Sequence, residues 1–218
     1  MVIETTSKNG DLRGVVAIGA SAGGVEALSS VAAGLSPDLP YAYLMVLHIP
    51  PDAPSVLAHI VDRNGSLPAV TAEHGASLEP AHIYVASPDR HLLVADHRVV
   101  QSQGPTENGH RPAINALFRS VALTFGPRAV GILMSGVLDD GVLGLKAIRS
   151  RGGTTIGQSL DDALFPELPA KARDAGVLDR QAAATEIGEV LKQLSQREIK
   201  EPGMEPDAQT RWSRAAPR

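Results

Sequence analysis

The chain alternates short apolar, β-branched runs with stretches of helical spacing, and this alternation is the feature that most limits its fold. The first run, Val15 to Ala20, is typical of a buried strand, and Val25 to Leu35 carries apolar residues at helical intervals. Strands separated by helices predict an α/β fold: a doubly wound, mostly parallel sheet with helices on both faces. Further strands are expected at Tyr41 to Ile49, Ala129 to Ser135 and Thr154 to Gln158, and further helices at Ser55 to Asp62, Gly141 to Ser150, Pro169 to Asp174 and Glu186 to Leu194.

The middle of the chain departs from this alternation. Short strand-like pieces at His82 to Ala86, His91 to Ala95 and Val99 to Gln101 are separated by turn signals. They predict an antiparallel β-ribbon inserted between the α/β units.

Helical spacing returns at Pro112, a residue suited to a first helical turn. The expected buried stripe of this helix is Ile114, Leu117, Val121 and Leu123. We expect one folded domain over residues 14–197, between a polar segment at 1–13 and a flexible, charged and proline-containing tail at 198–218.

The composition excludes several classes of function. The 218 residues include no cysteine, which excludes disulfides, thiol nucleophiles and thiolate metal sites. A formal net charge of -4 gives no electrostatic reason to expect nucleic acid or an anionic membrane as partner. The sequence shows no leader pattern and no long apolar run, so we expect a cytoplasmic chain without membrane insertion. No histidine shows a metal-ligand spacing, so neither a metal nor a cofactor is expected.

A serine flanked by glycines follows the first predicted strand. The segment from Gly19 to Gly24 reads GASAGG and leads directly into a helix, which places Ser21 in a nucleophile-elbow pattern. The N–H groups at the start of that helix, Ala22 first among them, are suited to stabilise an oxyanion. A glycine-rich phosphate-binding turn also joins a strand to a helix, and is the alternative interpretation of this segment.

Two other strand ends carry chemistry-bearing side chains. His48 ends the second predicted strand, and Asp139 and Asp140 follow the strand that begins at Ala129. Neighbouring parallel strands bring their ends to one cleft, so His48 could serve Ser21 as general base and a carboxylate could orient the imidazole. The alternatives are a structural histidine and two carboxylates that cap a helix.

The chain resembles the catalytic domain of the chemotaxis protein-glutamate methylesterase family (CheB) over about residues 14–197. The matching segments are VVAIGASAGGVEAL at 15–28, VLHIPP at 46–51, HIYVASPDRHL at 82–92, NGHRPAINALFRSVA at 108–122 and SGVLDDGVLGLKAIRSRGG at 135–153.

The resemblance implies a Ser-His-Asp triad of Ser21, His48 and Asp140, with Asp139 as a neighbour. It implies hydrolysis of glutamyl methyl esters on the cytoplasmic helices of methyl-accepting chemotaxis receptors, with release of methanol, and also deamidation of receptor glutamines. It further suggests that the Val137 N–H completes the oxyanion hole, and that His110 and Arg111 shape the cleft or bind an acidic receptor side chain.

Two departures from the family pattern matter. Leu138 stands where the family usually has glycine, and a leucine would be strained there if the loop needs a positive φ. The family usually also carries an N-terminal receiver domain, whereas only about 14 residues precede the first predicted strand. We therefore expect a chain that is not regulated by that route, a separate subunit working with a regulatory or methyltransferase partner, or an excised domain.

Three functional hypotheses follow. The leading one is a serine hydrolase, a stand-alone protein-glutamate methylesterase. The second is a non-catalytic CheB-like module that binds a receptor or signalling partner, the loop at 135–138 having lost activity. The third is a nucleotide-binding α/β protein.

Overall fold

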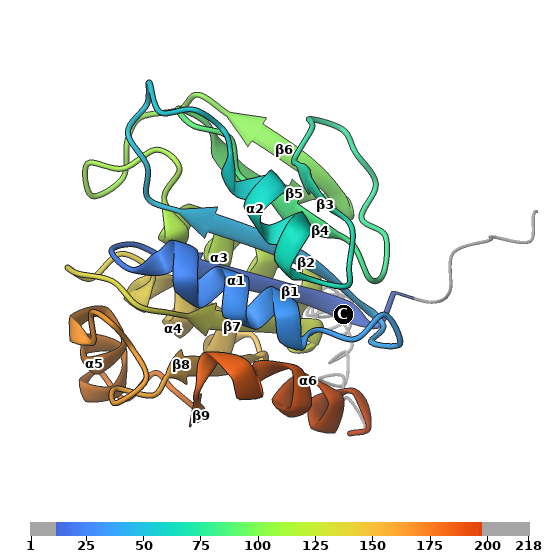
Figure 1. Cartoon of the computed structure of the whole chain (residues 1–218), viewed down its shortest axis with the longest axis vertical. Helices are drawn as coiled ribbons and strands as arrows, with labels where there is room; N and C mark the ends of the chain where they lie inside the picture. The colour runs from blue at the N-terminus through green and yellow to red at the C-terminus, as the bar shows by residue number, and fades with distance from the viewer. Residues whose placement is uncertain (1–11, 198–218) are drawn as a thin grey trace, which may run out of the picture.

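The computed structural model describes residues 12–197, which form a seven-stranded sheet with helices on both faces and a small two-stranded ribbon (Figure 1). The sheet has the order β3-β4-β2-β1-β7-β8-β9, and all of its strand pairs are parallel. Its strands are β1 (Gly14–Ala20), β2 (Tyr41–Leu47), β3 (Ala69–Thr71), β4 (Ile83–Val85), β7 (Ala129–Leu133), β8 (Thr154–Gln158) and β9 (Arg180–Ala182). The helices are α1 (Gly24–Gly34), α2 (Leu57–Asn64), α3 (Ile114–Phe125), α4 (Val142–Ser150), α5 (Glu167–Asp174) and α6 (Ile187–Ser195), with short 3-10 turns at Gly126–Arg128 and Ala184–Glu186.

Strand β1 lies at the centre of the sheet, and this position explains why its sequence is a continuous apolar run. It pairs with β2 on one side and with β7 on the other, and all of its residues are buried. A strand covered on both faces needs apolar side chains in both directions, so alternation with polar residues is lost. The predicted parallel, doubly wound arrangement is confirmed.

Two hydrophobic cores cover the two faces of this sheet. On one face, Val16 and Ile18 of β1 pack with residues of α1, α2 and α6. On the opposite face, Val15 and Ala17 pack with residues of α3, α4, α5 and the ribbon. Figure 1 shows α1, α2 and α6 on the viewer's side of the strands. Each helix is therefore held to the sheet by its apolar stripe.

The predicted antiparallel ribbon is confirmed, although one of its expected pieces lies elsewhere. The ribbon consists of β5 (His91–Ala95) and β6 (Arg98–Ser102), and the Val94 N–H donates to Ser120 Oγ of α3 at 3.0 Å. The piece predicted at His82 to Ala86 forms β4 of the main sheet instead. The three residues of β4 are buried against both cores, which requires a core strand and not a ribbon strand.

Helix α3 begins two residues later than predicted, and three of the four residues expected in its buried stripe are buried. Pro112 lies before the helix, whose N-cap is Ala113. Leu123, expected in the core, is 66% exposed, while Phe118 and Phe125 are buried. The observed stripe falls at positions 114, 117, 118, 121, 122 and 125, which is the spacing that keeps one face of a helix against the core.

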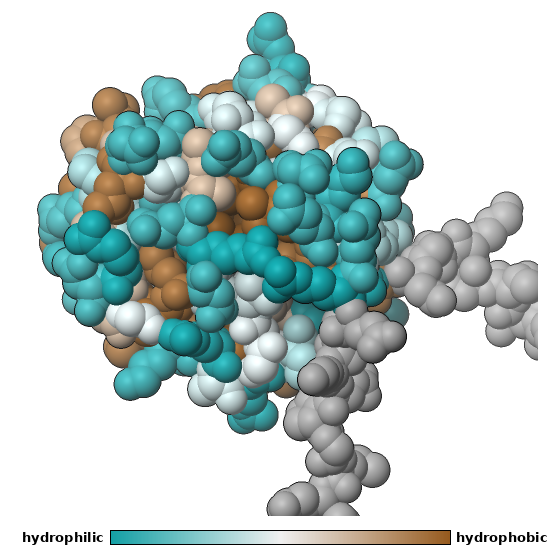
Figure 2. All heavy atoms as spheres, turned by 90° about the horizontal axis from the view of Figure 1, so that it is seen from below, coloured by the Kyte–Doolittle hydropathy of each residue, from teal (hydrophilic) through white to brown (hydrophobic). Residues whose placement is uncertain are grey.

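The segments at the two ends carry few structural observations. The expectations for most of residues 1–13 and for the tail at 198–218 lie outside the described residues, and the domain boundaries remain predictions. Over residues 12–197, no helix combines the length and the apolar character that a bilayer crossing requires. Seen from below, the surface is mainly hydrophilic, with hydrophobic patches between the polar side chains (Figure 2).

Candidate active site

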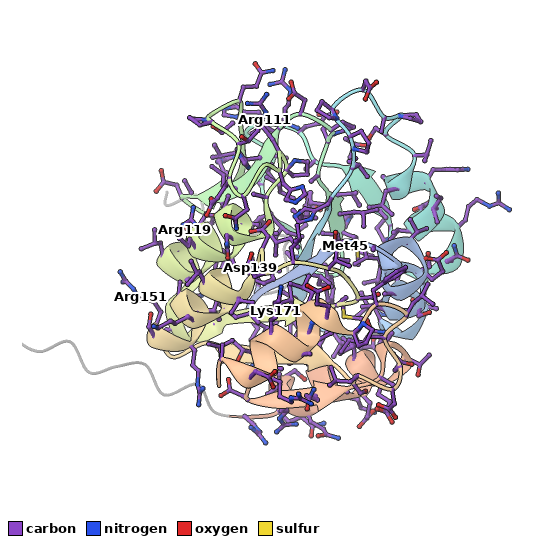
Figure 3. The ribbon with its side chains drawn as sticks, turned by 90° about the vertical axis from the view of Figure 1, so that its left-hand side faces the viewer. Met45, Arg111, Arg119, Asp139, Arg151 and Lys171 are labelled. Atoms are coloured by element: carbon purple, nitrogen blue, oxygen red, sulfur yellow. The ribbon has the colours of Figure 1, made fainter. Side chains whose placement is uncertain are left out.

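Ser21, His48 and Asp140 lie together beyond the carboxyl ends of three adjacent strands. Ser21 follows β1, His48 follows β2, and Asp140 follows β7 after a short loop. The arrowheads of β2 and β7 point to the left in Figure 1, and Figure 3 looks onto that side of the molecule, with Asp139 near its centre. Chain order reverses at β1, so the site lies at the switch point where doubly wound sheets bind ligands.

The backbone turns sharply at Ser21 because small residues surround it. Gly23 has a φ of 68°, a conformation that favours glycine, and α1 begins immediately after it. A Cβ on Gly136 would lie 2.9 Å from the Cβ of Ser21, so only glycine lets the loop after β7 approach the serine this closely. The Ser21 N–H donates to Ser135 O at 3.0 Å, which fixes the turn against that loop.

The three side chains form a continuous hydrogen-bonded chain. His48 Nδ1 lies 3.1 Å from Ser21 Oγ, and His48 Nε2 lies 2.8 Å from Asp140 Oδ2. The backbone N–H of His48 donates to Ala20 O at 3.1 Å, which extends the β1–β2 ladder to the histidine. The predicted residues are therefore brought together at hydrogen-bond distance.

Asp140 is buried and ionised. Its side chain is 1% exposed, and its oxygens accept the N–H groups of Ile114 at 2.7 Å and Asn115 at 3.0 Å. Burial acts to raise the pKa of this carboxyl, but the hydrogen bonds from His48 and from the two N–H groups outweigh it and hold the pKa below its usual range. A carboxylate only accepts hydrogen bonds, so Nε2 of His48 carries the proton and Nδ1 presents its lone pair to Ser21.

Asp140 and Asp139 differ in exposure and in contacts. The N–H groups that Asp140 accepts belong to the first turn of α3, so it stabilises that helix, not α4, which follows it in the sequence. Asp139 is exposed. Asp140 therefore contacts both His48 and the positive end of α3, and the capping alternative does not compete with the contact to His48.

Of the two N–H groups expected to form an oxyanion hole, that of Ala22 directly follows the serine, and that of Val137 follows Gly136, which packs against Ser21. Over residues 12–197, neither the Ala22 N–H nor the Val137 N–H donates to another group of the protein. Ser135, in the loop that carries Val137, ties this loop to the serine turn and to a third segment, because its Oγ donates to Ala22 O at 2.8 Å and accepts the Phe165 N–H at 2.9 Å. Next to Val137, Leu138 adopts a φ of 65°, and this positive φ is the condition under which a leucine at this position is strained.

His110 and Arg111 lie beside the serine and the histidine. The rings of His110 and His48 are stacked, with centroids 3.7 Å apart and an interplanar angle of 7°. Arg111, labelled in Figure 3, donates to Asp89 Oδ1 and to Gly104 O. The substrate contact expected of both residues remains a prediction.

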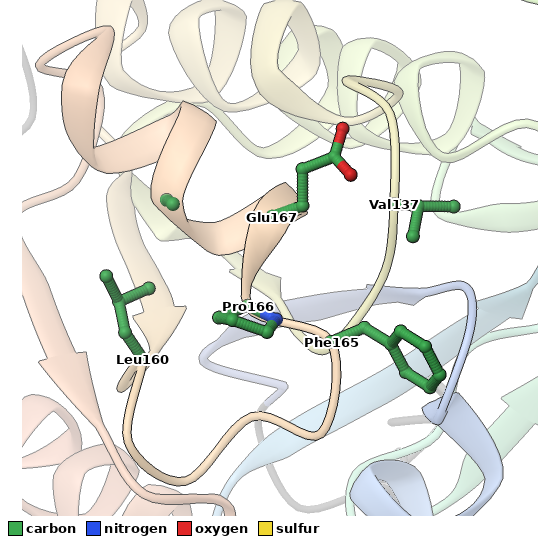
Figure 4. A pocket seen from close by; sticks show the side chains of 6 residues that line it. Val137, Leu160, Phe165, Pro166 and Glu167 are labelled. Atoms are coloured by element: carbon green, nitrogen blue, oxygen red, sulfur yellow. The ribbon is translucent and has the colours of Figure 1, made fainter.

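One cavity includes Ser21 and His48 in its lining, and a second is lined in part by Val137. One, of about 410 Å³, is lined by polar groups that include Ser21, His48, Asp89, His110 and Arg111. The other, of about 400 Å³, is mainly apolar and is lined by Val137, Leu160, Phe165, Pro166, Glu167 and Ala170 (Figure 4). No group of three or more potential metal ligands occurs within the described part of the chain.

Sequence reasoning missed three contributors to the site. The Asn115 side chain is buried and its Oδ1 accepts the N–H groups of Gly141 and Gly144. His91 is also buried, with one ring nitrogen 3.0 Å from Pro105 O and the other 3.2 Å from the Ala113 N–H. The third is the ring stack on His48. A polar residue inside an apolar helical stripe was the available signal for Asn115; nothing in the spacing indicated the two histidine contacts.

Comparison with protein families settles the affiliation of the chain. The family model described as CheB methylesterase matches residues 16–191. The chain belongs to this family. The resemblance seen in the separated sequence motifs is thereby confirmed.

Individual CheB relatives agree with this assignment. A protein of Geobacter metallireducens named protein-glutamate methylesterase/protein-glutamine glutaminase 4 is 36% identical over 182 residues, covering 83% of this chain and 52% of that protein. A protein of Gluconobacter oxydans named protein-glutamate methylesterase/protein-glutamine glutaminase is 36% identical over 190 residues, covering 84% of this chain and 54% of its own length. The chain thus spans about half the length of these relatives.

The fold agrees as well. The crystal structure of the Thermotoga maritima CheB methylesterase catalytic domain superposes with a TM-score of 0.79 at 26% sequence identity. The match covers 83% of this chain and 98% of the other. The CheB catalytic-domain fold is therefore the fold of this chain.

Proposed function

We propose that this chain is a protein-glutamate methylesterase, a serine hydrolase that demethylates glutamyl methyl esters on chemoreceptors. The observation that carries the proposal is the hydrogen-bonded chain from Ser21 Oγ through both ring nitrogens of His48 to Asp140. Ordered donors and acceptors of this kind activate a hydroxyl for attack on a carbonyl. The relatives are about twice as long as this chain, and their names support the choice of substrate.

Acylation begins with proton transfer between two atoms that are already in contact. Ser21 Oγ attacks the ester carbonyl carbon while His48 Nδ1, 3.1 Å away, takes the hydroxyl proton. The positive charge on the imidazolium is stabilised by Asp140, whose Oδ2 lies 2.8 Å from Nε2. The negative charge that develops on the carbonyl oxygen is stabilised by the N–H groups of Ala22 and Val137.

The tetrahedral intermediate formed by this attack then breaks down with loss of methanol. The bond to the methoxy oxygen breaks, and His48 returns its proton to that oxygen, so that methanol leaves and a glutamyl ester of Ser21 remains. In the second half, His48 takes a proton from water, whose oxygen attacks the acyl carbon. The bond between the acyl carbon and Ser21 Oγ then breaks, His48 returns its proton to Oγ, and the product acid ionises to the glutamate carboxylate, which leaves the free enzyme.

The same atoms serve a deamidation. In a glutamine side chain the leaving group departs as ammonia, and its nitrogen needs the His48 proton more than the methoxy oxygen does because it is the more basic atom. The double name of the relatives supports a second, glutaminase activity. The proposed substrates are receptor side chains in the cytoplasm, which is where we place the chain.

The alternatives are less well supported. Asp140 also stabilises α3, but a non-catalytic binding module gives no reason for its alignment with His48 and Ser21 in one hydrogen-bonded chain. A nucleotide-binding role gives no reason for a histidine hydrogen-bonded to Ser21 beside the glycine-rich turn.

The decisive experiment measures methanol release from methylated receptor. We expect Ser21→Ala to lower kcat by about ten-thousand-fold or more, because removal of the nucleophile disables the whole triad. The control is Ser55→Ala, which changes an exposed serine outside the site and leaves the rate unchanged. Equal rates for Ser21→Ala and the native chain would refute the proposal, and saturable receptor binding without any release would favour the binding module.

A further inference from the structure

A second imidazole covers one face of the proposed general base. The His110 ring lies parallel to the His48 ring at a centroid distance of 3.7 Å, which is full van der Waals contact over the ring face. With His110 in place, the His48 side chain is 5% exposed. Rotation of the His48 ring out of its plane would drive it into His110.

The backbone around His110 is built to hold the ring in this position. Asn108 and Gly109 have φ values of 51° and 79°, and the chain on either side is joined by two hydrogen bonds between Glu107 and His110. Positive φ at both central residues defines the tight hairpin turn for which Asn-Gly is the preferred sequence. His110 therefore stands at a fixed end of a turn, not on a mobile loop.

Two ion pairs tie this turn to the rest of the fold. The guanidinium of Arg119 on α3 pairs with the carboxylate of Glu107, and Arg111 pairs with Asp89. Arg111 also donates to Gly104 O at 2.8 Å. These contacts fix the backbone on both sides of His110, so its ring is held in the stack on His48.

The geometry points to His110 as a positioning residue whose neutral ring holds the His48 imidazole in the plane that joins Ser21 to Asp140. This inference rests on the proposed function, since it concerns the base of that reaction. The His48 ring contacts Ser21 Oγ at 3.1 Å and Asp140 Oδ2 at 2.8 Å, so a small rotation of the ring would break one of these two hydrogen bonds. The stack supplies that restraint from the ring face, where neither Ser21 nor Asp140 acts.

The role also requires His110 to be uncharged. Burial lowers the pKa of His110, repulsion from His48 lowers it further, and attraction by Asp140 opposes the shift, leaving a net lowering. The titratable groups that face the stack are His48 itself and Asp140, and the charged groups around it are the Arg111–Asp89 and Arg119–Glu107 pairs. A protonated His110 would place a positive charge against the imidazolium that forms when Ser21 is deprotonated, and would slow the reaction.

Two substitutions separate the ring from its charge. His110→Phe keeps a flat, neutral ring over His48, whereas His110→Ala removes the ring. We expect His110→Ala to lower kcat by about 10- to 100-fold with KM within about twofold, since a misplaced base costs rate and not ground-state binding. We expect His110→Phe to keep kcat within about threefold of the native value. His59→Ala, at an exposed histidine of α2, is the matched control and leaves both constants unchanged.

The pH dependence provides a readout that a purely structural role would not change. Both histidines of the native chain must be neutral, so the acid limb of log(kcat/KM) steepens from a slope of one towards two as pH falls. In His110→Phe one of the two imidazoles is absent, and the slope stays at one. Native kcat in folded His110→Ala, or identical acid limbs in the native chain and His110→Phe, would overturn the inference.

A second assay keeps this test separate from the proposed function. A small fluorophosphonate labels any serine that is activated by a neighbouring histidine, whatever its natural substrate. If labelling depends on Ser21 and falls in His110→Ala but not in His110→Phe, the stacking role stands even where no methanol is released, and only the choice of substrate fails. If labelling depends on Ser21 and is equal in all three chains, the stacking role is overturned.

Discussion

Leu138 has a backbone conformation that its side chain disfavours. Its φ of 65° lies in the left-handed region, where a residue with a Cβ costs about 1–2 kcal/mol relative to the right-handed one. Its side chain is 52% exposed, so little burial offsets that cost. The strain lies next to Val137, whose N–H is proposed to hold the oxyanion. Strain of this kind persists only where neighbouring contacts fix the loop, as Ser135 does here.

We therefore expect Leu138→Gly to raise the free energy of unfolding by about 0.5–1 kcal/mol, after allowance for the greater freedom of glycine in the unfolded chain. For a domain of this size that corresponds to a melting temperature higher by about 1–4 °C. Calorimetry and urea unfolding measure both quantities. Asp139→Gly is the matched control, because Asp139 is exposed in the same loop without a positive φ, and we expect it to lower stability. A Leu138→Gly variant no more stable than the native chain would contradict the presence of strain.

At the same scale, the sequence predicted the residues that stand at strand ends. Ser21, His48 and the Asp139–Asp140 pair could be found because chain order brings the ends of parallel strands to one edge, whereas the choice of Asp140 over Asp139 came from the family resemblance. The stack of His110 on His48 could not be found, because it depends on where a turn far along the chain returns to the sheet. Side-chain contacts between distant loops leave no periodic signal.

Helices α3 and α4 are joined by a reciprocal exchange of caps at their first turns. Asp140, just before α4, accepts the N–H groups of Ile114 and Asn115 in α3, and Asn115 Oδ1 accepts the N–H groups of Gly141 at 3.0 Å and Gly144 at 2.7 Å. These groups belong to the helix ends that have no partner within their own helix. The exchange fixes Asp140 relative to α3, and so positions the third member of the proposed triad.

We expect Asn115→Ala to lower the free energy of unfolding by about 2–4 kcal/mol, because two buried N–H groups lose their acceptor. We also expect a lower kcat, since the turn that carries Asp140 loses its anchor. Urea unfolding and methanol release measure the two effects. Leu123→Ala, on the exposed side of the same helix, should change stability by no more than about 0.5 kcal/mol. A neutral effect of Asn115→Ala would show that the caps are not needed.

The longer helices and strands were predicted within a few residues, whereas two short strands were missed. The strands β3 (Ala69–Thr71) and β9 (Arg180–Ala182) have three residues each and lie at the two edges of the sheet. A strand of three residues is too short to show the alternation of apolar and polar side chains that marks a strand, and its pairing depends on the neighbouring strand. The middle segment at β4 was assigned to the ribbon because a short apolar run does not say which sheet it joins.

On the scale of the whole molecule, Asp140 stands out as a charged group inside an otherwise apolar fold. The buried polar residues among those described are His91, Asn115, Ser135, Asp140, Thr155 and Gln158, and Asp140 is the one acid in this set. The pKa of Asp140 is held below its usual range, so the folded state releases the proton more readily than the unfolded state does. The stability that follows from this difference is fully present above the unfolded-state pKa of about 3.9 and is lost as pH falls through the lower folded-state pKa.

The resistance of the whole fold to acid should therefore depend on this one buried carboxylate. At pH 7 we expect Asp140→Asn to lower the free energy of unfolding by about 1–3 kcal/mol, because a charged acceptor of three hydrogen bonds is replaced by a neutral one. Below about pH 4 the native chain loses the same contribution, so the urea midpoints of the two chains should converge. Glu167→Gln is the control: the pKa of Glu167 is also lowered, through Lys171, but the carboxylate is exposed and water screens the pair, so its effect should be much smaller. A gap between native and Asp140→Asn midpoints that stays constant from pH 7 to pH 3 would mean that the charge of Asp140 does not stabilise the fold.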